Sequence, residues 1–265
     1  RKYYNAEGFI ICSVNATEHS VMCAGTKENE IDTFRYLMDN YPTGILSVVS
    51  DTWDLWKVLT KYLPKLKEEV IARKGKLVIR PDSGDPVDII CGEIRTLGAN
   101  LPKEKGVVEL LWDIFGGTVN NQGFKVLDPH IGTIYGDSIT TERAENICKR
   151  LHDKGFASTN VVLGIGSFTY QYNTRDTFGF AMKATSVVVN GEQREIFKDP
   201  ITDDGIKKSA KGLVKVCNVN GQYILEDQVT REQENKGELQ VIYENGQFMN
   251  QVSLQEIRTL INKNI

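Results

Sequence analysis

The chain has 265 residues, 40% of them hydrophobic and 25% charged, which is the composition of an ordinary globular protein. A net charge of -3 gives no general attraction to nucleic acid or to an anionic membrane surface, so we expect neither as a partner. The five cysteines are widely spaced and include no Cys-x-x-Cys pair. This pattern favours a reducing compartment over a disulfide framework or a zinc site.

The chain up to about residue 176 alternates strand-like and helix-like runs. In chain order we predict a strand at 9–14, helices at 18–24 and 28–39, a strand at 45–50, an amphipathic helix at 53–72 interrupted near Pro64, a strand at 76–80, helices at 87–97 and 107–115, a Gly/Asn-rich loop, a strand at 131–135, a helix at 141–154 and a strand at 160–163. Such alternation indicates parallel βαβ units in an α/β fold. A closed barrel of this type needs eight units, and only four or five are visible. We therefore expect a partial or irregular TIM-like β/α barrel, which either is irregular or has its first strands upstream of Arg1.

The pattern changes after about residue 177, where short alternating runs are separated by tight turns. A strand-like run at 180–189 is followed by three Asn-Gly turn signals, at Asn190-Gly191, Asn220-Gly221 and Asn245-Gly246. A capped terminal helix is predicted at residues 253–262. We therefore predict two domains. Residues 1–176 form the β/α barrel portion, and residues 177–265 form a smaller β-hairpin-rich module with a terminal helix.

The segment Lys76–Pro86 concentrates chemistry where a predicted strand becomes a loop. Arg80 carries a planar fork of donors that suits phosphate oxygens. Asp82 and Asp85 have carboxylates that can hold magnesium, stabilise a developing cation or bind ribose hydroxyls, and Gly84 lets a ligand approach the backbone closely. The segment fits a site for a phosphorylated sugar. It fits equally well a turn with one surface salt bridge and an aspartate that caps the next helix.

Other polar segments also follow predicted strands. They are Asp51, Gly136-Asp137 and Gly164-Ile165-Gly166-Ser167. Because ligands of parallel α/β sheets bind at the carboxyl ends of the strands, we expect these segments to meet Arg80 and Asp82 at one rim. Backbone amides at such helix starts bind phosphate, although caps and turns explain the same residues. A dinucleotide fingerprint lacks its third glycine here, and no Walker lysine is present.

His19 lies just past the first predicted strand, near the start of a helix. Its imidazole can bind phosphate or accept a phosphoryl group near neutral pH. The alternative is a partly exposed histidine at a helix end. His130 and His152 have no comparable setting and are expected to be structural or solvated.

Six motifs in order resemble the nicotinamide phosphoribosyltransferase family, a group of type II phosphoribosyltransferases. They are Ala16-Thr17-Glu18-His19-Ser20, Ser47-Val48-Val49-Ser50-Asp51, Arg80-Pro81-Asp82-Ser83-Gly84, Tyr135-Gly136-Asp137, Gly164-Ile165-Gly166 and Thr174-Arg175-Asp176, and Phe197-Lys198-Asp199-Pro200 continues the match. The resemblance covers essentially the whole chain. It corresponds to roughly the C-terminal half of the family's protein.

The resemblance implies a cytoplasmic enzyme of NAD salvage. Nicotinamide would attack the anomeric carbon of phosphoribosyl pyrophosphate, giving nicotinamide mononucleotide and pyrophosphate, with Mg²⁺ as cofactor and ATP as a coupled co-substrate. A homodimer with a shared active site is implied as well. The implied roles are catalysis for His19, Asp51 and Asp82, magnesium binding, in part through water, for the two aspartates, and substrate binding for Ser13, Ser47, Arg80, Gly136, Asp137, Gly166, Ser167 and Arg175. Within these roles, the resemblance implies that ATP phosphorylates His19 and that Ser13 and Ser47 lie near the pyridine amide.

The chain departs from the family pattern at Ser167-Phe168, where the family has further glycines. The family's residues that stack on nicotinamide and select amide over acid would precede Arg1. Nicotinate phosphoribosyltransferase therefore stays an alternative, as does an inactive fragment that needs its N-terminal half. An unrelated phosphate-binding barrel enzyme is a third alternative. It predicts a Schiff-base lysine or an acid/base pair at the strand ends, and the sequence offers neither.

Overall fold

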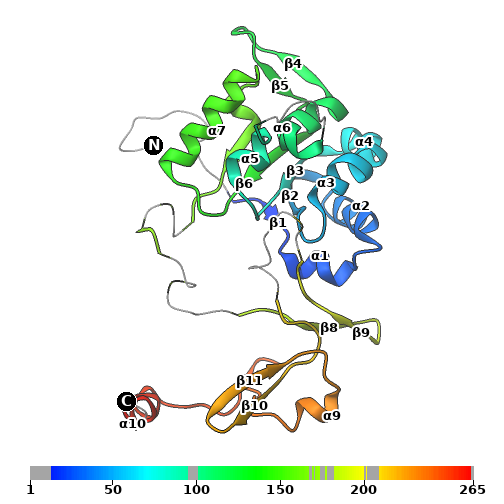
Figure 1. Cartoon of the computed structure of the whole chain (residues 1–265). Helices are drawn as coiled ribbons and strands as arrows, with labels where there is room; N and C mark the ends of the chain where they lie inside the picture. Colours follow the sequence, from blue (N-terminus) through cyan, green and yellow to red (C-terminus); the bar gives the residue numbers. More distant parts are fainter. Residues whose placement is uncertain are drawn as a thin grey trace. The chain divides into compact units, whose positions relative to one another are not determined.

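The computed structural model describes residues 13–94, 101–166, 169, 171–173, 177, 182–199, 201 and 209–263 (Figure 1). The chain divides into two compact units, Arg1–Ser209 and Ala210–Ile265. The domain boundary predicted at residue 176 lies outside the described residues and stays a prediction.

The first unit contains a parallel sheet of five strands. They are β1 (Asn15–Ala16), β2 (Thr43–Val49), β3 (Lys74–Arg80), β6 (Ile131–Tyr135) and β7 (Val161–Leu163), in the order β1-β2-β3-β6-β7. The α/β class with parallel βαβ units is thereby confirmed. The strand predicted at 9–14 is wrong over its described residues, because Ser13 and Val14 precede β1, and positions 9–12 of that prediction lie outside the described residues.

Helices follow each of the first four strands of this sheet. They are α1 (His19–Gly25), α2 (Glu30–Asn40), α3 (Leu55–Lys57), α4 (Leu63–Ala72), α5 (Pro86–Cys91), α6 (Pro102–Phe115) and α7 (Thr141–Asp153). The interruption predicted near Pro64 is a π-helical turn, η1 (Val58–Tyr62), in which the N–H of Leu63 donates to the carbonyl of Val58. Proline has no N–H to continue the α-helical pattern, so a wider turn precedes it.

The predicted helix 87–97 is wrong at its C-terminal end, because α5 stops at Cys91. Gly92 follows with a φ of 91°, and a Cβ there would lie 2.1 Å from the carbonyl oxygen of Glu104. This close approach of two backbones ends α5 and joins it to α6. The helix predicted from Val107 already begins at Pro102, and it is interrupted at Gly106, where φ is 77°.

A short hairpin was missed in the predicted Gly/Asn-rich loop. Strands β4 (Gly117–Val119) and β5 (Lys125–Leu127) pair antiparallel there. The side-chain oxygen of Asn120 accepts from the N–H groups of Gln122 and Phe124, which closes the turn.

The core of the first unit lies between the helices and one face of the sheet. Successive strand side chains point to opposite faces, and the set that faces the helices is fully buried. This set includes Leu46, Val48, Leu77, Ile79, Ile131 and Tyr135. The opposite face carries Ser47, Val78 and Arg80, together with Ile45 and Val162, which are 38% and 56% exposed. The sheet is therefore packed on one face and less covered on the other.

A β-hairpin ends the described part of the first unit. Strands β8 (Ser186–Val189) and β9 (Glu192–Glu195) pair antiparallel across Asn190-Gly191, and both turn residues have positive φ. The predicted turn is confirmed. The chain then runs beside the loop after β2, where the N–H of Asp199 donates to the carbonyl of Thr52 at 3.4 Å.

The second unit consists of two hairpins and two helices. They are β10 (Lys215–Val219) with β11 (Gln222–Glu226), α9 (Arg231–Glu234), β12 (Tyr243–Glu244) with β13 (Gln247–Phe248), and α10 (Leu254–Lys263). The predicted capping box of the last helix is confirmed, because Ser253 N–H donates to Glu256 Oε2 and Glu256 N–H donates to Ser253 Oγ.

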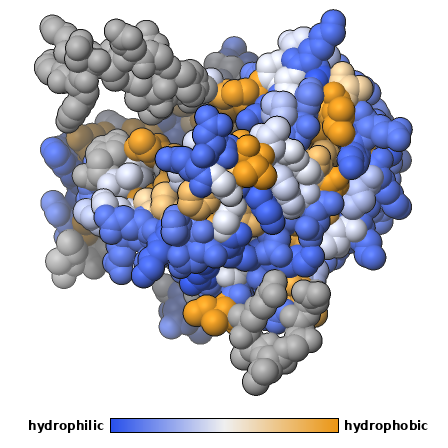
Figure 2. Space-filling view, turned by 90° about the horizontal axis from the view of Figure 1, so that it is seen from above, coloured by the Kyte–Doolittle hydropathy of each residue, from blue (hydrophilic) through white to orange (hydrophobic). Residues whose placement is uncertain are grey.

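The surface drawn in Figure 2 is mostly hydrophilic, with small hydrophobic patches between polar side chains. In the described part of the chain, no helix combines the length and the apolar character that crossing a lipid bilayer requires.

Arg73 holds the chain at the N-terminal end of β2. Its buried guanidinium donates to the carbonyls of Tyr41, Thr43 and Gly44, which lie between the end of α2 and the start of β2. We expect Arg73→Met to lower the free energy of unfolding by about 2–4 kcal/mol, because three buried acceptors lose a charged donor. Urea titration followed by circular dichroism measures this loss.

Arg35→Met is the matched control. Arg35 is paired at the surface with Glu69 and Asp32, and such exposed pairs contribute little. Equal midpoints for the two variants would contradict a structural role for Arg73.

Candidate functional site

The loops after β2 and β3 are joined through the carboxylate of Asp51. Its Oδ2 accepts a hydrogen bond from the backbone N–H of Asp82 at 2.9 Å and one from the hydroxyl of Ser83 at 2.5 Å. Val49 and Arg80 are paired in the parallel ladder, so both strands end at the same edge of the sheet. The polar residues that follow them are thereby brought together, as the sequence indicated.

The loop after β3 is also fixed from β6. The buried hydroxyl of Tyr135 donates to the carbonyl of Gly84 at 2.8 Å. Further along this loop, Asp85 accepts from the N–H groups of Val87 and Asp88 and so caps α5. The capping alternative considered for this segment therefore holds for Asp85, while Asp82 remains directed toward His19.

His19 begins α1 and lies beside the loops after β2 and β3. Its Nε2 is 3.5 Å from Asp82 Oδ2, and its Nδ1 is 3.3 Å from the hydroxyl oxygen of Thr52. Lys198 approaches the same Nε2 at 3.4 Å. The preceding Thr17 sets this position, because its hydroxyl accepts from the N–H of Val49. An imidazole is thus held between a carboxylate, a hydroxyl and an ammonium group.

Three buried polar atoms near these strand ends have no hydrogen-bond partner among the described residues. They are Ser47 Oγ, Asp51 Oδ1 and Arg80 Nε. Arg80 also lies 3.7 Å, through Nη2, from the exposed Glu18. The ladder register places Ser47 and Arg80 on the same face of the sheet. Because buried polar groups in proteins are almost always hydrogen-bonded, these atoms indicate a place for a polar ligand or water.

The glycines after β6 and β7 differ in their surroundings. A Cβ at Gly164 would lie 2.6 Å from the Cα of Gly136, so Gly164 is needed for the two loops to pack. At Gly136 and Gly166 a Cβ would meet no atom within 4 Å, so these backbones are open to a ligand. Between them Ser138 has a φ of 52°, and its carbonyl accepts from Arg143.

The remaining predicted site residues are placed as follows. Asp137 follows Gly136 directly, and its Oδ1 accepts from the hydroxyl of Ser138 at 3.3 Å. Ser13 is exposed and precedes β1, while Ser167 and Arg175 lie outside the described residues. Of the other histidines, His130 lies 2.8 Å from Asp128 and His152 lies 3.2 Å from Asp153. Those short local pairs agree with their expected structural role.

The sequence reasoning missed Thr52, Lys198 and Glu30. Lys198 lay within a recognised motif but had no signal for its place beside His19. Glu30 looked like an ordinary helix-start acid, yet it is buried, and burial raises its pKa to about 8. The charges of Asp54 and Asp51 raise this pKa further, while Lys57 and Lys27 lower it.

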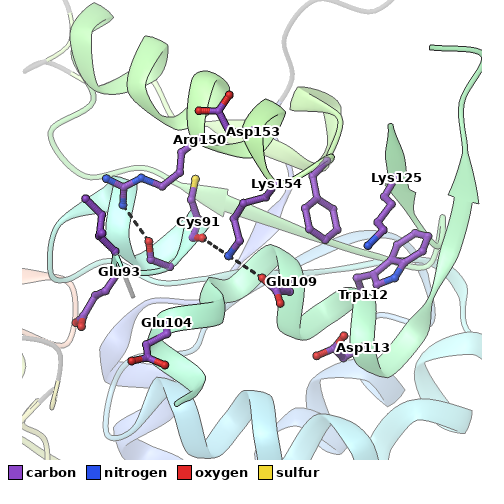
Figure 3. A pocket seen from close by; sticks show the side chains of 13 residues that line it. Cys91, Glu93, Glu104, Glu109, Trp112, Asp113, Lys125, Arg150, Asp153 and Lys154 are labelled. Carbon is purple, nitrogen blue, oxygen red and sulfur yellow. Dashed lines mark hydrogen bonds and ion pairs between the residues drawn. The ribbon is translucent and has the colours of Figure 1, made fainter. Parts of the chain in front are cut away.

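A separate cavity lies away from these strand ends. It measures about 690 Å³ and is lined by the end of α5 and by α6 and α7 (Figure 3). Figure 3 shows Lys154 reaching between Cys91 and Glu109, to which it is bound at 2.7 and 2.6 Å. The main charged side chains that line this cavity are paired with other groups of the protein. We therefore place the functional site at the strand ends instead. Among the described residues, no three or more histidine, cysteine, aspartate or glutamate side chains are grouped so that they could hold a metal.

A parallel α/β sheet with an arginine, two carboxylates and open glycine loops at its carboxyl edge is typical of proteins that bind phosphate-bearing ligands. Comparison with known families agrees, because the model of the nicotinate phosphoribosyltransferase (NAPRTase) family matches residues 4–247. The chain therefore belongs to the nicotinate phosphoribosyltransferase family.

Three curated relatives are named nicotinamide phosphoribosyltransferase. The relative from Acinetobacter baylyi is 54% identical over 264 residues, which is 97% of this chain and 52% of the relative. The relative from Mycoplasma pneumoniae is 45% identical over 72% of this chain and 42% of its own length. The relative from Xanthomonas campestris pv. campestris is 34% identical over 93% of this chain and 51% of its own length. The chain thus spans about half the length of the curated relatives it matches.

The buried carboxyl of Glu30 predicts a pH dependence of stability. Its pKa is about 8 in the folded chain against 4.5 for an ordinary glutamate, so the folded state holds the proton more tightly. The stability that this proton binding contributes is fully present below the pKa of Glu30 in the unfolded chain. It is lost as the pH rises through the pKa of Glu30 in the folded chain. Between about pH 5 and pH 8.5 we expect Glu30→Gln to gain roughly 2 kcal/mol or more relative to wild type. Urea titrations at both pH values measure this difference.

Glu68→Gln, at an exposed position of α4, is the control and should follow wild type at both pH values. A flat difference between Glu30→Gln and wild type across this range would show that Glu30 is ionised in the folded chain.

Proposed function

We propose that this chain forms the phosphoribosyl site of an enzyme of NAD salvage. The reaction is transfer of a phosphoribosyl group from phosphoribosyl pyrophosphate to nicotinamide, giving nicotinamide mononucleotide and pyrophosphate. The names of the relatives support this substrate pair. The observation that carries the proposal is the hydrogen bond from the backbone of Asp82 to the carboxylate of Asp51. Buried atoms without a partner among the described residues, Asp51 Oδ1 and Arg80 Nε, accompany it.

We also propose that the sheet is part of a TIM-like barrel. Its five strands lie in the order in which they follow along the chain, and all are parallel. A doubly wound sheet would reverse its strand order at a switch point, whereas a barrel keeps neighbours consecutive. The less covered face, with Ile45 and Val162 exposed, corresponds to a barrel interior.

In the proposed reaction, the ring nitrogen of nicotinamide bonds to the anomeric carbon while the bond to the diphosphate oxygen breaks. The electron pair of that bond leaves with pyrophosphate. Positive charge grows on the ribose ring in the transition state, so a fixed carboxylate nearby lowers the barrier. Asp82 supplies that charge, because Asp51 holds its backbone in place. Arg80 and the open backbones of Gly136 and Gly166 bind the phosphate and ribose groups.

The two aspartates fit a magnesium site. Carboxylate oxygens are the donors that Mg²⁺ prefers, and it usually takes one or two carboxylates together with waters and phosphate oxygens. Asp51 offers the unpartnered Oδ1 and Asp82 a partly exposed carboxylate, so these two would hold the ion, in part through water. When bound, Mg²⁺ supplies charge neutralisation for the leaving diphosphate.

ATP is the proposed coupled co-substrate. The imidazole of His19 takes the γ-phosphoryl group, with a nitrogen–phosphorus bond forming as the bond to the ADP oxygen breaks. The placement of His19 beside Asp82 and Lys198 supports this role, because both charges lie within 3.5 Å of the same nitrogen. A homodimer with a shared active site and a cytoplasmic location complete the proposal.

Nicotinate is the second candidate substrate, because the matched family carries the name of the acid and the relatives carry that of the amide. The test is a product assay with phosphoribosyl pyrophosphate, ATP, Mg²⁺ and each pyridine in turn. The chain is assayed alone and after co-expression with the part of the Acinetobacter baylyi relative that lies outside the match. We expect nicotinamide mononucleotide from the co-expressed pair. Product from nicotinate alone would favour the second candidate, and no product from either pyridine would contradict the proposal.

Asp82→Asn tests the catalytic assignment. We expect turnover by the co-expressed pair to fall by roughly 100-fold or more, with a much smaller change in the affinity for phosphoribosyl pyrophosphate, because the charge matters most in the transition state. Steady-state kinetics and calorimetric binding measure the two effects. Asp113→Asn, an exposed acid on α6 that pairs with Lys105, is the control. Equal losses in turnover and affinity would mean that Asp82 only positions the ligand.

A further inference from the structure

Lys198 places a positive charge directly beside the imidazole of His19. Its Nζ lies 3.4 Å from Nε2, while Oδ2 of Asp82 lies 3.5 Å from the same nitrogen. The other ring nitrogen, Nδ1, is 3.3 Å from the hydroxyl oxygen of Thr52. One ring nitrogen therefore faces a cation and an anion together.

These two neighbours favour different tautomers. An ammonium group only donates, so a hydrogen bond from Lys198 requires a lone pair on Nε2 and puts the ring proton on Nδ1. A carboxylate only accepts, so a hydrogen bond to Asp82 requires the proton on Nε2 instead. The Thr52 hydroxyl can accept from Nδ1–H or donate to an unprotonated Nδ1, so it is compatible with both states.

The backbone on both sides of Lys198 is anchored. The thiol of Cys23 donates to the carbonyl of Phe197 at 2.8 Å, and the Phe197 ring packs edge-on against Trp53 with centroids 5.1 Å apart. Burial raises the pKa of Cys23 to about 11, so this donor keeps its proton at neutral pH. On the other side, Asp199 N–H donates to Thr52, the residue whose hydroxyl meets His19.

We propose that Lys198 is a positioning residue that holds neutral His19 in the Nδ1–H tautomer, because its ammonium group donates to the lone pair of Nε2. The Lys198 contact requires this tautomer, whereas the Asp82 contact opposes it. Acceptance of a phosphoryl group at Nε2, for which Lys198 gives up this hydrogen bond, rests on the proposed function.

Nitrogen-15 NMR of the imidazole rings tests the inference without substrate. The chain has only 3 histidines, and His19→Gln identifies the signals of interest. At a pH where the ring is neutral, we expect wild type to show mainly Nδ1–H. Lys198→Met should shift the tautomer ratio toward Nε2–H by roughly fivefold or more, the effect of one lost hydrogen bond. Lys198→Arg keeps a cationic donor and should retain the wild-type ratio.

Lys65→Met, at an exposed position of α4, is the matched control and should leave the ratio unchanged. Backbone amide spectra check that each variant is folded, and Lys198→Gln replaces Lys198→Met should the latter unfold. A wild-type ring with its proton on Nε2, or an unchanged ratio in the folded lysine variants, would overturn the inference. The expected tautomer in a chain whose co-expressed form makes no product would support the inference and overturn the proposed function alone.

Discussion

The site depends on the two hydrogen bonds that Asp51 Oδ2 accepts from the loop after β3. A carboxylate that is only 1% exposed is costly unless it is paired, so these bonds are required for Asp51 to be where it is. They also set the course of the backbone at Asp82. A single side chain thus orders two neighbouring loops and leaves its other oxygen unpartnered among the described residues. The same residue serves as both a structural anchor and a candidate ligand group.

A second constraint comes from far along the chain. The segment after β9 brings Lys198 to His19. The backbone N–H of Asp199 bonds to Thr52, and the ring of Phe197 packs on Trp53. Sequence separation of 179 residues between His19 and Lys198 makes this contact invisible to any local pattern. The segment that follows the β8–β9 hairpin is therefore part of the site, although the hairpin's sequence signals only a tight turn.

The sheet and its order of elements could be predicted from the sequence because buried parallel strands are continuous apolar runs, and Ile131–Tyr135 was predicted with its observed bounds. The end of α5 could not, since Gly92 stops the helix through a contact with Glu104 on the next helix. The meeting of Asp51, Arg80 and Asp82 followed from the rule that parallel strands end at one edge. The burial of Glu30 did not, because an acid at a helix start is usually exposed and favourable there.

The charges at the strand ends are arranged before any ligand arrives. The carboxylate of Asp51 binds the backbone of Asp82, the carboxylate of Asp82 lies beside His19, and Arg80 and Lys198 are the nearby cations. The proposed substrate, whose ribose becomes cationic while its diphosphate leaves as an anion, needs charges of both signs within a few ångströms. Because Asp51 fixes the backbone at Asp82, little reorganisation of this loop remains to be made when charge develops, and fixed charges of this kind are most effective in stabilising a transition state. The unpartnered atoms of Ser47, Asp51 and Arg80 then mark where the ligand completes a hydrogen-bond network that the described residues leave open.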